Sequence, residues 1–149
     1  MFDSTSGTAA TAGIVATAAT NLHVEDCWFK GAFSDAVIEF GAGDAHGARI
    51  LRNFIEGANQ GIDINASTTD SSGATQSSIL IAGNVIRTAT ECINDAADIA
   101  MIVNNVCVTA QAKGAAGAGA IVGNELISGG NKISASDLAN ANWPALGTL

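Results

Sequence analysis

The fold is decided by a short pattern that is clearest in Ile81-Ala82-Gly83-Asn84-Val85-Ile86: an apolar residue, two residues, Asn, one residue and another apolar residue. It recurs at 50–55, 102–107 and 121–126, and an earlier copy at 24–29 has Cys in place of Asn. The fourth position of the pattern is occupied in the five copies by Cys27, Asn53, Asn84, Asn105 and Asn124, with spacings of 26, 31, 21 and 19 residues. A unit this short cannot bury its own apolar face, so the repeat predicts units that stack on one another.

The residues before each copy alternate between apolar and other side chains, which is the period of a strand and not of a helix. The alternating pairs are Leu22/Val24, Ala48/Ile50, Ile79/Ile81 and Ala100/Ile102. A second alternating stretch follows at 36–40, at 61–64 and, in poorer register, at 92–94. Each repeat therefore predicts at least two short strands, separated by Gly, Asn, Ser or Thr.

An Asn at one position in every repeat predicts a ladder of side-chain amides, each bonded to the amides above and below it. Such a ladder satisfies a polar side chain that is costly to bury alone. Asn also tolerates the left-handed backbone that a sharp corner needs. The single Pro of the chain fits this interpretation, because Pro removes a backbone donor from a ladder.

The Asn-centred repeat and the strand alternation resemble the right-handed parallel β-helix proteins of the pectin-lyase-like superfamily, over roughly residues 21–130. The resemblance implies an all-β fold, a short right-handed parallel β-helix (solenoid) of about five coils with N- and C-terminal capping segments. We expect an N-terminal cap or arm at 1–20, the β-helix at 21–130 and a C-terminal tail or cap at 131–149. The competing folds are a left-handed β-helix, whose hexapeptide rhythm we do not find, and a β-sandwich with coincidental Asn turns.

Three segments depart from the repeat. The polar run 65–78 lies in the longest interval and is predicted to protrude as a loop, since insertions leave a solenoid at its surface. The Ala/Gly run 112–120 predicts a tight final coil or a close subunit contact. In the tail, Ser136 is a candidate helix cap, and Trp143-Pro144 is expected to pack on the last coil or on a neighbouring subunit.

Composition excludes several classes of protein. The chain has 14 acidic and 6 basic residues, a net charge of −8, and 48% hydrophobic residues, which is too apolar for a disordered chain. Six cations can hardly form the basic footprint that nucleic acid requires, so we expect no nucleic-acid partner. No apolar run approaches a membrane span, and the N-terminal residues lack the pattern of a signal peptide. The three Cys form no CxxC pair and are predicted to be buried free thiols.

Enzymes with the β-helix fold cleave acidic polysaccharides, and their hydrolases need paired carboxylates roughly 5–10 Å apart. The acidic candidates are Asp63, Asp95 and Asp98. Asp63 is expected to point outward between two Ile, one coil from Asp95, and we interpret all three as solvated surface charges. Ordinary ion pairing is expected for the nearby cations Arg49, Arg52 and Arg87.

Neither His indicates a metal site. His23 is predicted to point outward from a strand and His46 to lie in a loop, and a third ligand at a fixed spacing is missing. No nucleophile elbow, zinc-protease, Walker or EF-hand motif occurs. We therefore predict no catalytic, cofactor-binding or metal-binding residue, no cofactor, and no enzymatic activity.

The small, acidic, Ala/Gly/Thr-rich chain further resembles β-helical proteins of bacteriophage particles. This implies a structural virion protein, either a capsid decoration or a tail-appendage subunit, that contacts other virion proteins such as the capsid. We expect a closed homo-oligomer, most plausibly a trimer. The alternative is a polysaccharide-binding or polysaccharide-cleaving β-helix module, although five coils of about 4.8 Å give only a short groove. A detached repeat domain with a purely oligomerising role is the third hypothesis.

Overall fold

The chain is described from a computed structural model, which covers residues 1–4, 10–72, 78–97, 99–109, 121–122, 125–128 and 131–132. Every regular element in these ranges is a strand. The strands are β1 (Phe2–Ser4), β2 (Ile14–Ala16), β3 (His23–Glu25), β4 (Trp28–Gly31), β5 (Ala36–Phe40), β6 (Gly43–Asp44), β7 (Arg49–Leu51), β8 (Phe54–Ile64), β9 (Thr68–Thr69), β10 (Ile79–Ala82), β11 (Val85–Asp95), β12 (Ala100–Val103), β13 (Val106–Thr109), β14 (Ile121–Val122), β15 (Glu125–Ser128) and β16 (Asn131–Lys132).

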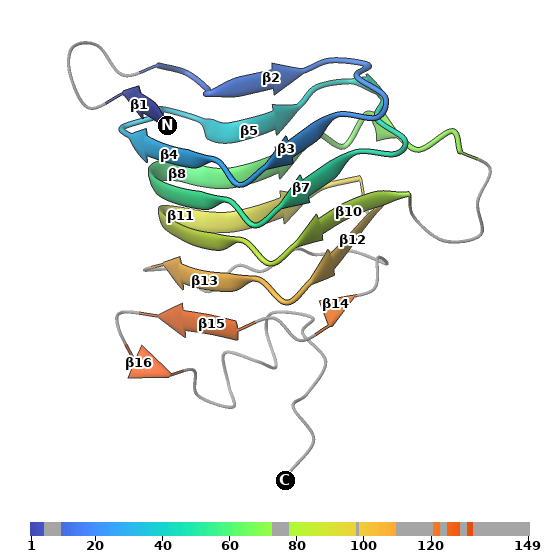
Figure 1. The fold of residues 1–149 in the computed structure, drawn as a ribbon. Coiled ribbons are helices and arrows are strands. Elements are labelled where there is room, and N and C mark those ends of the chain that lie inside the picture. Colours follow the sequence, from blue (N-terminus) through green and yellow to red (C-terminus); the bar gives the residue numbers. More distant parts are fainter. Residues whose placement is uncertain are drawn as a thin grey trace, which may run out of the picture.

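The strands form three sheets (Figure 1). A nine-stranded large sheet runs β1-β4-β8-β11-β13-β15-β16, with β5 beside β8 and β2 beside β5. A five-stranded sheet runs β14-β12-β10-β7-β3, and β6 pairs with β9. All described strand pairs are parallel except the pair of β15 with β16. The predictions of an all-β chain and of parallel pairing are confirmed.

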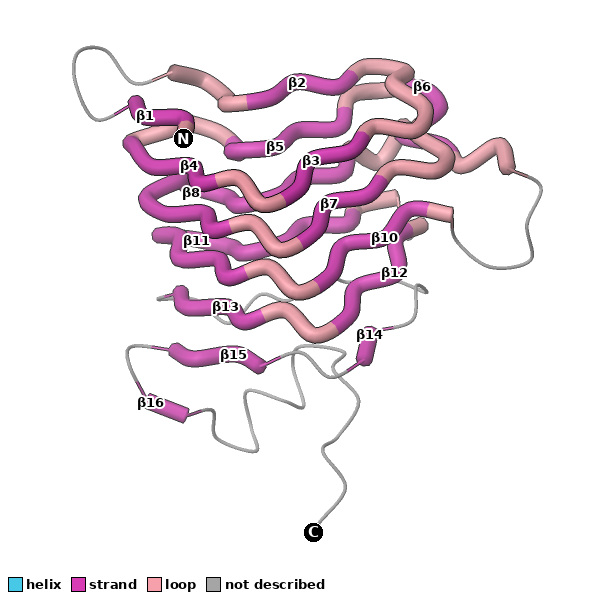
Figure 2. The backbone as a smooth tube through the Cα atoms, viewed as in Figure 1, coloured by secondary structure: helices cyan, strands magenta, loops and turns pink. Residues whose placement is uncertain are grey.

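Four strands of the five-stranded sheet each continue directly into a strand of the large sheet. β3, β7, β10 and β12 lie in the five-stranded sheet, and each leads through a short corner into β4, β8, β11 or β13 of the large sheet. Figure 2 shows these corners one above another between the two sheets. We call this column of turns the Asn corner, because the repeated Asn lies in it. Parallel pairing in register brings equivalent residues of successive repeats together.

The register aligns the apolar residues of successive repeats on the inside. In the five-stranded sheet one column consists of Val24, Ile50, Ile81 and Ile102. In the large sheet the matching column consists of Phe29, Ile55, Ile86 and Cys107. All of these side chains are buried. The predicted alternation before each Asn is thus confirmed as alternation between interior and exterior.

The long strands β8 and β11 each supply two stretches of the large sheet. The first half of β8 pairs with β4, and its second half pairs with β5. On its other side, β8 pairs with β11 over both halves. The chain bends between the halves, where the pairing of β8 with β11 shifts register near Thr88. Gly57 at this bend has φ +84°, and a Cβ there would lie 2.5 Å from the carbonyl oxygen of Gly31. Only glycine fits this position.

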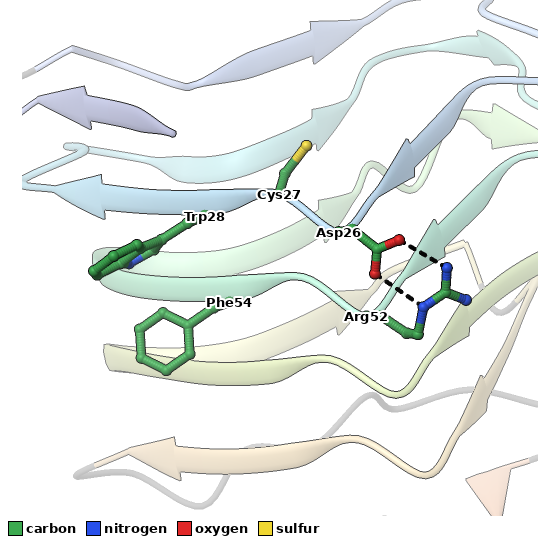
Figure 3. A pocket seen from close by; sticks show the side chains of 5 residues that line it. All are labelled: Asp26, Cys27, Trp28, Arg52 and Phe54. Atoms are coloured by element: carbon green, nitrogen blue, oxygen red, sulfur yellow. Dashed lines mark hydrogen bonds and ion pairs between the residues drawn. The ribbon is translucent and has the colours of Figure 1, made fainter.

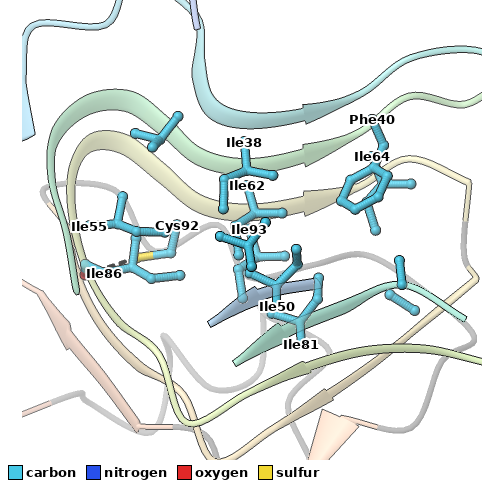
Figure 4. Packing of buried hydrophobic residues seen from close by; sticks show 14 of the residues in the cluster. Ile38, Phe40, Ile50, Ile55, Ile62, Ile64, Ile81, Ile86, Cys92 and Ile93 are labelled. Atoms are coloured by element: carbon cyan, nitrogen blue, oxygen red, sulfur yellow. Dashed lines mark hydrogen bonds between the residues drawn. The ribbon is translucent and has the colours of Figure 1, made fainter. Parts of the chain in front are cut away.

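A third interior column closes the core behind the bend (Figure 4). It aligns Ile38, Ile62 and Ile93, with Cys92 buried beside them. Cys92 and Cys107 confirm the prediction of buried free thiols, whereas the free thiol Cys27 is only half-buried. A hydrogen bond with Cys92, reinforced by burial, raises the pKa of the Cys107 thiol.

Two segments predicted to lie outside the repeats contain strands. At the N-terminus, β1 pairs with β4 and β2 pairs with β5. The polar run 65–78 begins with β9, which pairs with β6, and Thr68 in β9 is buried. The predictions for 112–120, Asn124, Ser136 and Trp143-Pro144 concern positions outside the described residues. Among the residues described, no helix is long and apolar enough to span a membrane.

Candidate functional site

The Asn corner contains the predicted amide ladder. Asn84 Oδ1 accepts hydrogen bonds from the backbone N–H and the side-chain amide of Asn53, at 2.9 and 3.0 Å. Asn105 Oδ1 accepts the same two bonds from Asn84, both at 2.9 Å. Asn53 Oδ1 accepts the N–H of Cys27 at 3.0 Å. All three Asn are buried, so the ladder prediction is confirmed for these repeats.

Cys27 closes the ladder at its N-terminal end. The direction of the bonds is constant, because each Asn oxygen accepts from the repeat that precedes it. Cys27 lies in the first copy of the pattern and donates its own N–H to Asn53. The Cys27 thiol itself donates to the carbonyl oxygen of Glu25 within the same repeat.

The left-handed residue of each corner is the one before the ladder position. Asp26, Arg52, Gly83 and Asn104 have φ values of 52°, 52°, 66° and 53°. The ladder residues that follow them do not have positive φ. The prediction that the ladder Asn itself supplies this conformation is therefore wrong. In each corner, one residue adopts the left-handed conformation of the turn, and the next residue makes the hydrogen bonds of the ladder.

A charged clamp covers the first two corners. Arg52 Nε and Nη2 donate to the two carboxylate oxygens of Asp26, both at 2.9 Å, and Nη2 also contacts Glu25. The hydrogen bonds from Arg52 lower the pKa of Asp26. The predicted ion pairing of Arg52 is thus confirmed, although these exposed side chains are screened by solvent.

The clamp borders an open depression of about 510 Å³ (Figure 3). It is lined by Asp26, Cys27, Trp28, Arg52 and Phe54. Trp28 is 46% exposed and Phe54 is 39% exposed, and their rings meet edge to face with centroids 5.8 Å apart. The alternation in the sequence places both rings outside, but the sequence interpretation singled out neither. The depression combines aromatic surface with planar charged groups.

The structure does not pair the candidate carboxylates Asp63 and Asp95. Asp63 lies opposite Asn94, which donates to it at 2.7 Å, whereas Asp95 lies opposite Ile64. Asp95 is buried and accepts the backbone N–H groups of Ile99 and Ala100, at 3.1 and 2.8 Å. The predictions that Asp95 is a solvated charge and neighbours Asp63 in the stack are wrong, because the register is one residue away.

Asp63 faces outward, as predicted, and is half-buried. Burial raises its pKa, and Asp35 adds a like charge. The hydrogen bond from Asn94 opposes this shift. Asp98 lies outside the described residues. In the described ranges no group of three His, Cys, Asp or Glu side chains is placed to hold a metal ion.

The two His lie where the sequence predicted them. His23 is exposed on β3, and His46 lies in the loop after β6. His46 Nδ1 is 2.8 Å from Asp44 Oδ2, and Ser71 Oγ is 3.4 Å from the same nitrogen. A nucleophilic relay needs the Ser and the Asp on opposite nitrogens of the ring. This cluster instead ties two loops together.

The remaining candidate cations lie on the surface. Arg49 is exposed on β7, opposite His23 of β3. Arg87 Nη1 lies 3.6 Å from Glu56 Oε1 in the neighbouring repeat. The predicted ion pairing is confirmed for Arg87.

The outward positions of the five-stranded sheet are mostly apolar. Leu51, Ala82 and Val103 form one column, and Leu80 and Met101 form another. All five are half-buried. We call these five residues the apolar face. The sequence contained its signal, since these positions alternate with the interior residues, but the interpretation considered only the interior set.

Comparison with known proteins adds no relative: family models, curated proteins and solved structures each gave no match to this chain.

Proposed function

We propose that this chain is a structural subunit of a bacteriophage particle, built as a short right-handed parallel β-helix of about five coils and acting by assembly with copies of itself. The fold proposal is supported by parallel, in-register pairing of equivalent strands and by the Asn ladder. The proposal of a virion location, as a capsid decoration or a tail appendage next to proteins such as the capsid, rests on the sequence resemblance.

The apolar face carries the assembly proposal. Five apolar side chains point outward from three neighbouring strands, and the polar and charged positions of this sheet surface, at His23, Glu25 and Arg49, lie toward its N-terminal end. Contiguous apolar surface on the outer face of a sheet is a feature of interaction sites. Because the chain carries a net charge of −8, copies associate most favourably where they bring no charges together. We expect a closed homotrimer through this face.

A structural role is also supported by the hydrogen bonds of three acidic side chains. Asp95 caps a turn, Asp63 is bonded to Asn94, and Asp44 joins two loops. Each has a partner within the fold. We therefore propose that the chain is not an enzyme.

Sedimentation equilibrium of the double variant Leu80→Glu/Met101→Glu tests the proposal. Two carboxylates per copy on the apolar face should reduce the assembly mass threefold. The matched control is Val85→Glu, an exposed outward position on the large sheet, which should leave the mass unchanged. A monomeric wild-type protein at micromolar concentration, or a double variant of unchanged mass, would refute assembly through this face. Co-purification with a particle, at a copy number divisible by three, tests the virion location.

A polysaccharide-binding module is the second candidate function, favoured by the depression at Trp28. An exposed aromatic ring supplies apolar contact area, and the adjacent Asp26 and Arg52 supply hydrogen-bonding groups. Calorimetric titration with a panel of acidic polysaccharides tests this function. The wild-type chain is compared with Trp28→Ala, and Val85→Ala is the control. Binding that Trp28→Ala abolishes supports this function, and absence of binding by the wild-type chain removes it. Release of reducing or unsaturated ends during incubation would show cleavage.

A further inference from the structure

The N-terminal edge of the large sheet is formed by β1 beside β4 and by β2 beside β5. Among the described strands, β2 pairs with β5 alone. The Ala16 carbonyl accepts the N–H of Gly41 at 3.0 Å, so Ala16 presents its backbone groups to β5. Successive residues of a strand present these groups to alternate sides, so Val15 presents its N–H and C=O to the open edge. The side chain of Val15 is also 61% exposed.

The two sheet edges at this end of the molecule differ in charge. β3 ends the five-stranded sheet with exposed His23 and Glu25, followed by Asp26. Short, charged edges of this kind resist pairing with other strands. In contrast, residues 4–22, which include β2, contain no charged side chain. The β2 edge is as short as the β3 edge but lacks its charges.

We propose that the β2 edge pairs with the β2 edge of a second copy, so that the large sheets of two copies become continuous. A two-fold axis relates identical strands in antiparallel orientation. Val15 then lies opposite Val15 of the second copy, and the two residues exchange both backbone hydrogen bonds. A second copy is the favoured occupant, because two chains of charge −8 can meet at this uncharged segment without placing negative charges against each other. This edge pair is separate from the apolar face and closes after two copies.

The main test is Val15→Pro, which removes the outward N–H and no hydrogen bond to β5. Sedimentation equilibrium should show an assembly mass half that of the wild type. Val15→Thr is the matched control, because it keeps the N–H and the strand preference and should keep the wild-type mass. Unfolding by denaturant checks that Val15→Pro retains the fold. A folded Val15→Pro variant with wild-type mass would overturn the edge pair.

Hydrogen exchange on the wild-type chain gives a second measurement that needs no substitution. The Val15 amide should exchange slowly at high protein concentration and at least tenfold faster after dilution below the dissociation constant. The same dependence of the Val15 exchange rate on protein concentration should persist in Leu80→Glu/Met101→Glu, because that variant disrupts the apolar face and not the β2 edge. Concentration-independent exchange at Val15 would refute the edge pair and leave the proposed function unaffected.

Discussion

The chain connections at the two ends of the strands in the five-stranded sheet are held by different kinds of hydrogen bond. At the Asn corner, every described repeat uses one left-handed residue followed by one ladder position. At the opposite end, the connections 41–48, 65–78 and 96–99 differ in length, and their described residues differ in hydrogen bonding. Asn84 satisfies backbone groups of neighbouring repeats, whereas Asp95 and Asp70 bond within their own loops. Side-chain bonds that recur in every described repeat fix the length of the corner, whereas bonds that differ from one connection to the next, such as that of Ser71 to Asp44, allow the length to vary.

The largest expected effect is that of Asn84→Leu at the Asn corner. The substitution leaves the Asn53 backbone N–H and the Ile50 carbonyl without their side-chain partners, in a buried site. Buried groups left unsatisfied cost about 1–3 kcal/mol each, so for two groups we expect a loss of roughly 2–6 kcal/mol. Urea unfolding monitored by circular dichroism measures it.

Asn94→Leu is the control for this prediction, because Asn94 is half-buried on the outer face and its side-chain amide donates to Asp63. It should lose less than about 1 kcal/mol, as surface changes do. Equal losses in the two variants would mean that the ladder contributes no more than an ordinary surface amide.

The next effect is that of Gly83→Ala at the turn residue of the same corner. Gly83 has φ +66°, and a Cβ there would meet only the Arg52 Cγ, at 3.6 Å. Space is available, so the cost is conformational, and a left-handed non-glycine residue costs about 1–2 kcal/mol. Urea unfolding should show a loss of this size. Gly83→Asn should lose less, as Asn104 occupies the equivalent position; no loss in either variant would contradict the turn role.

The Asn corner was predictable because its signal is periodic. One residue type at one position implied the ladder, and the flanking alternation implied the interior columns of Ile50, Ile81 and Ile102. The left-handed residue was missed because four different residue types occupy it. Backbone conformation there is imposed by the stacked neighbours, so no single residue type marks it.

The other end of the strands was less predictable because its contacts differ from one repeat to the next. Asp95 was placed in the wrong register, since β11 shifts against β8 at the bend before it. The pairing of β9 with β6 was missed within a polar run. The apolar face and the Trp28 ring of the candidate sites occupy the outward positions of the alternating strands, so the sequence pattern could have predicted them. Side-chain partners such as Asn94 for Asp63 depend on register that the sequence does not specify.

A smaller effect, limited to acid pH, is expected at the loops opposite the Asn corner. Hydrogen bonds from Ser71, and then from His46, lower the pKa of Asp44 from its ordinary value near 3.9. A lowered pKa stabilises the fold above the unfolded-state value, and this contribution is lost as the pH falls through the folded-state value. Asp44→Asn should therefore make stability fall less steeply below about pH 4. Urea midpoints at a series of pH values measure it.

Asp63→Asn provides the opposite sign as a control for Asp44→Asn. Burial raises the pKa of Asp63, so its ionised form weakens the fold at neutral pH, and this penalty disappears as the pH falls. Removing it should make the acid loss of stability steeper. Identical pH profiles for the two variants would mean that neither carboxyl changes its protonation differently on folding.

The smallest effect is expected for Arg52→Met, which breaks the charged clamp and keeps the left-handed residue and its aliphatic stem. The Arg52 side chain is 55% exposed, and its partners Glu25 and Asp26 are also in contact with solvent. Exposed ion pairs contribute little and are screened by salt, so the loss should be below that of Gly83→Ala and should vanish in 1 M salt, where the screening length is about 3 Å. Urea unfolding at low and high salt, with Arg87→Met as the control at a longer ion pair, measures this. A salt-independent loss as large as that of Asn84→Leu would show that the clamp, and not the buried ladder, holds the corner, and it would reverse the contrast between the two ends of the strands.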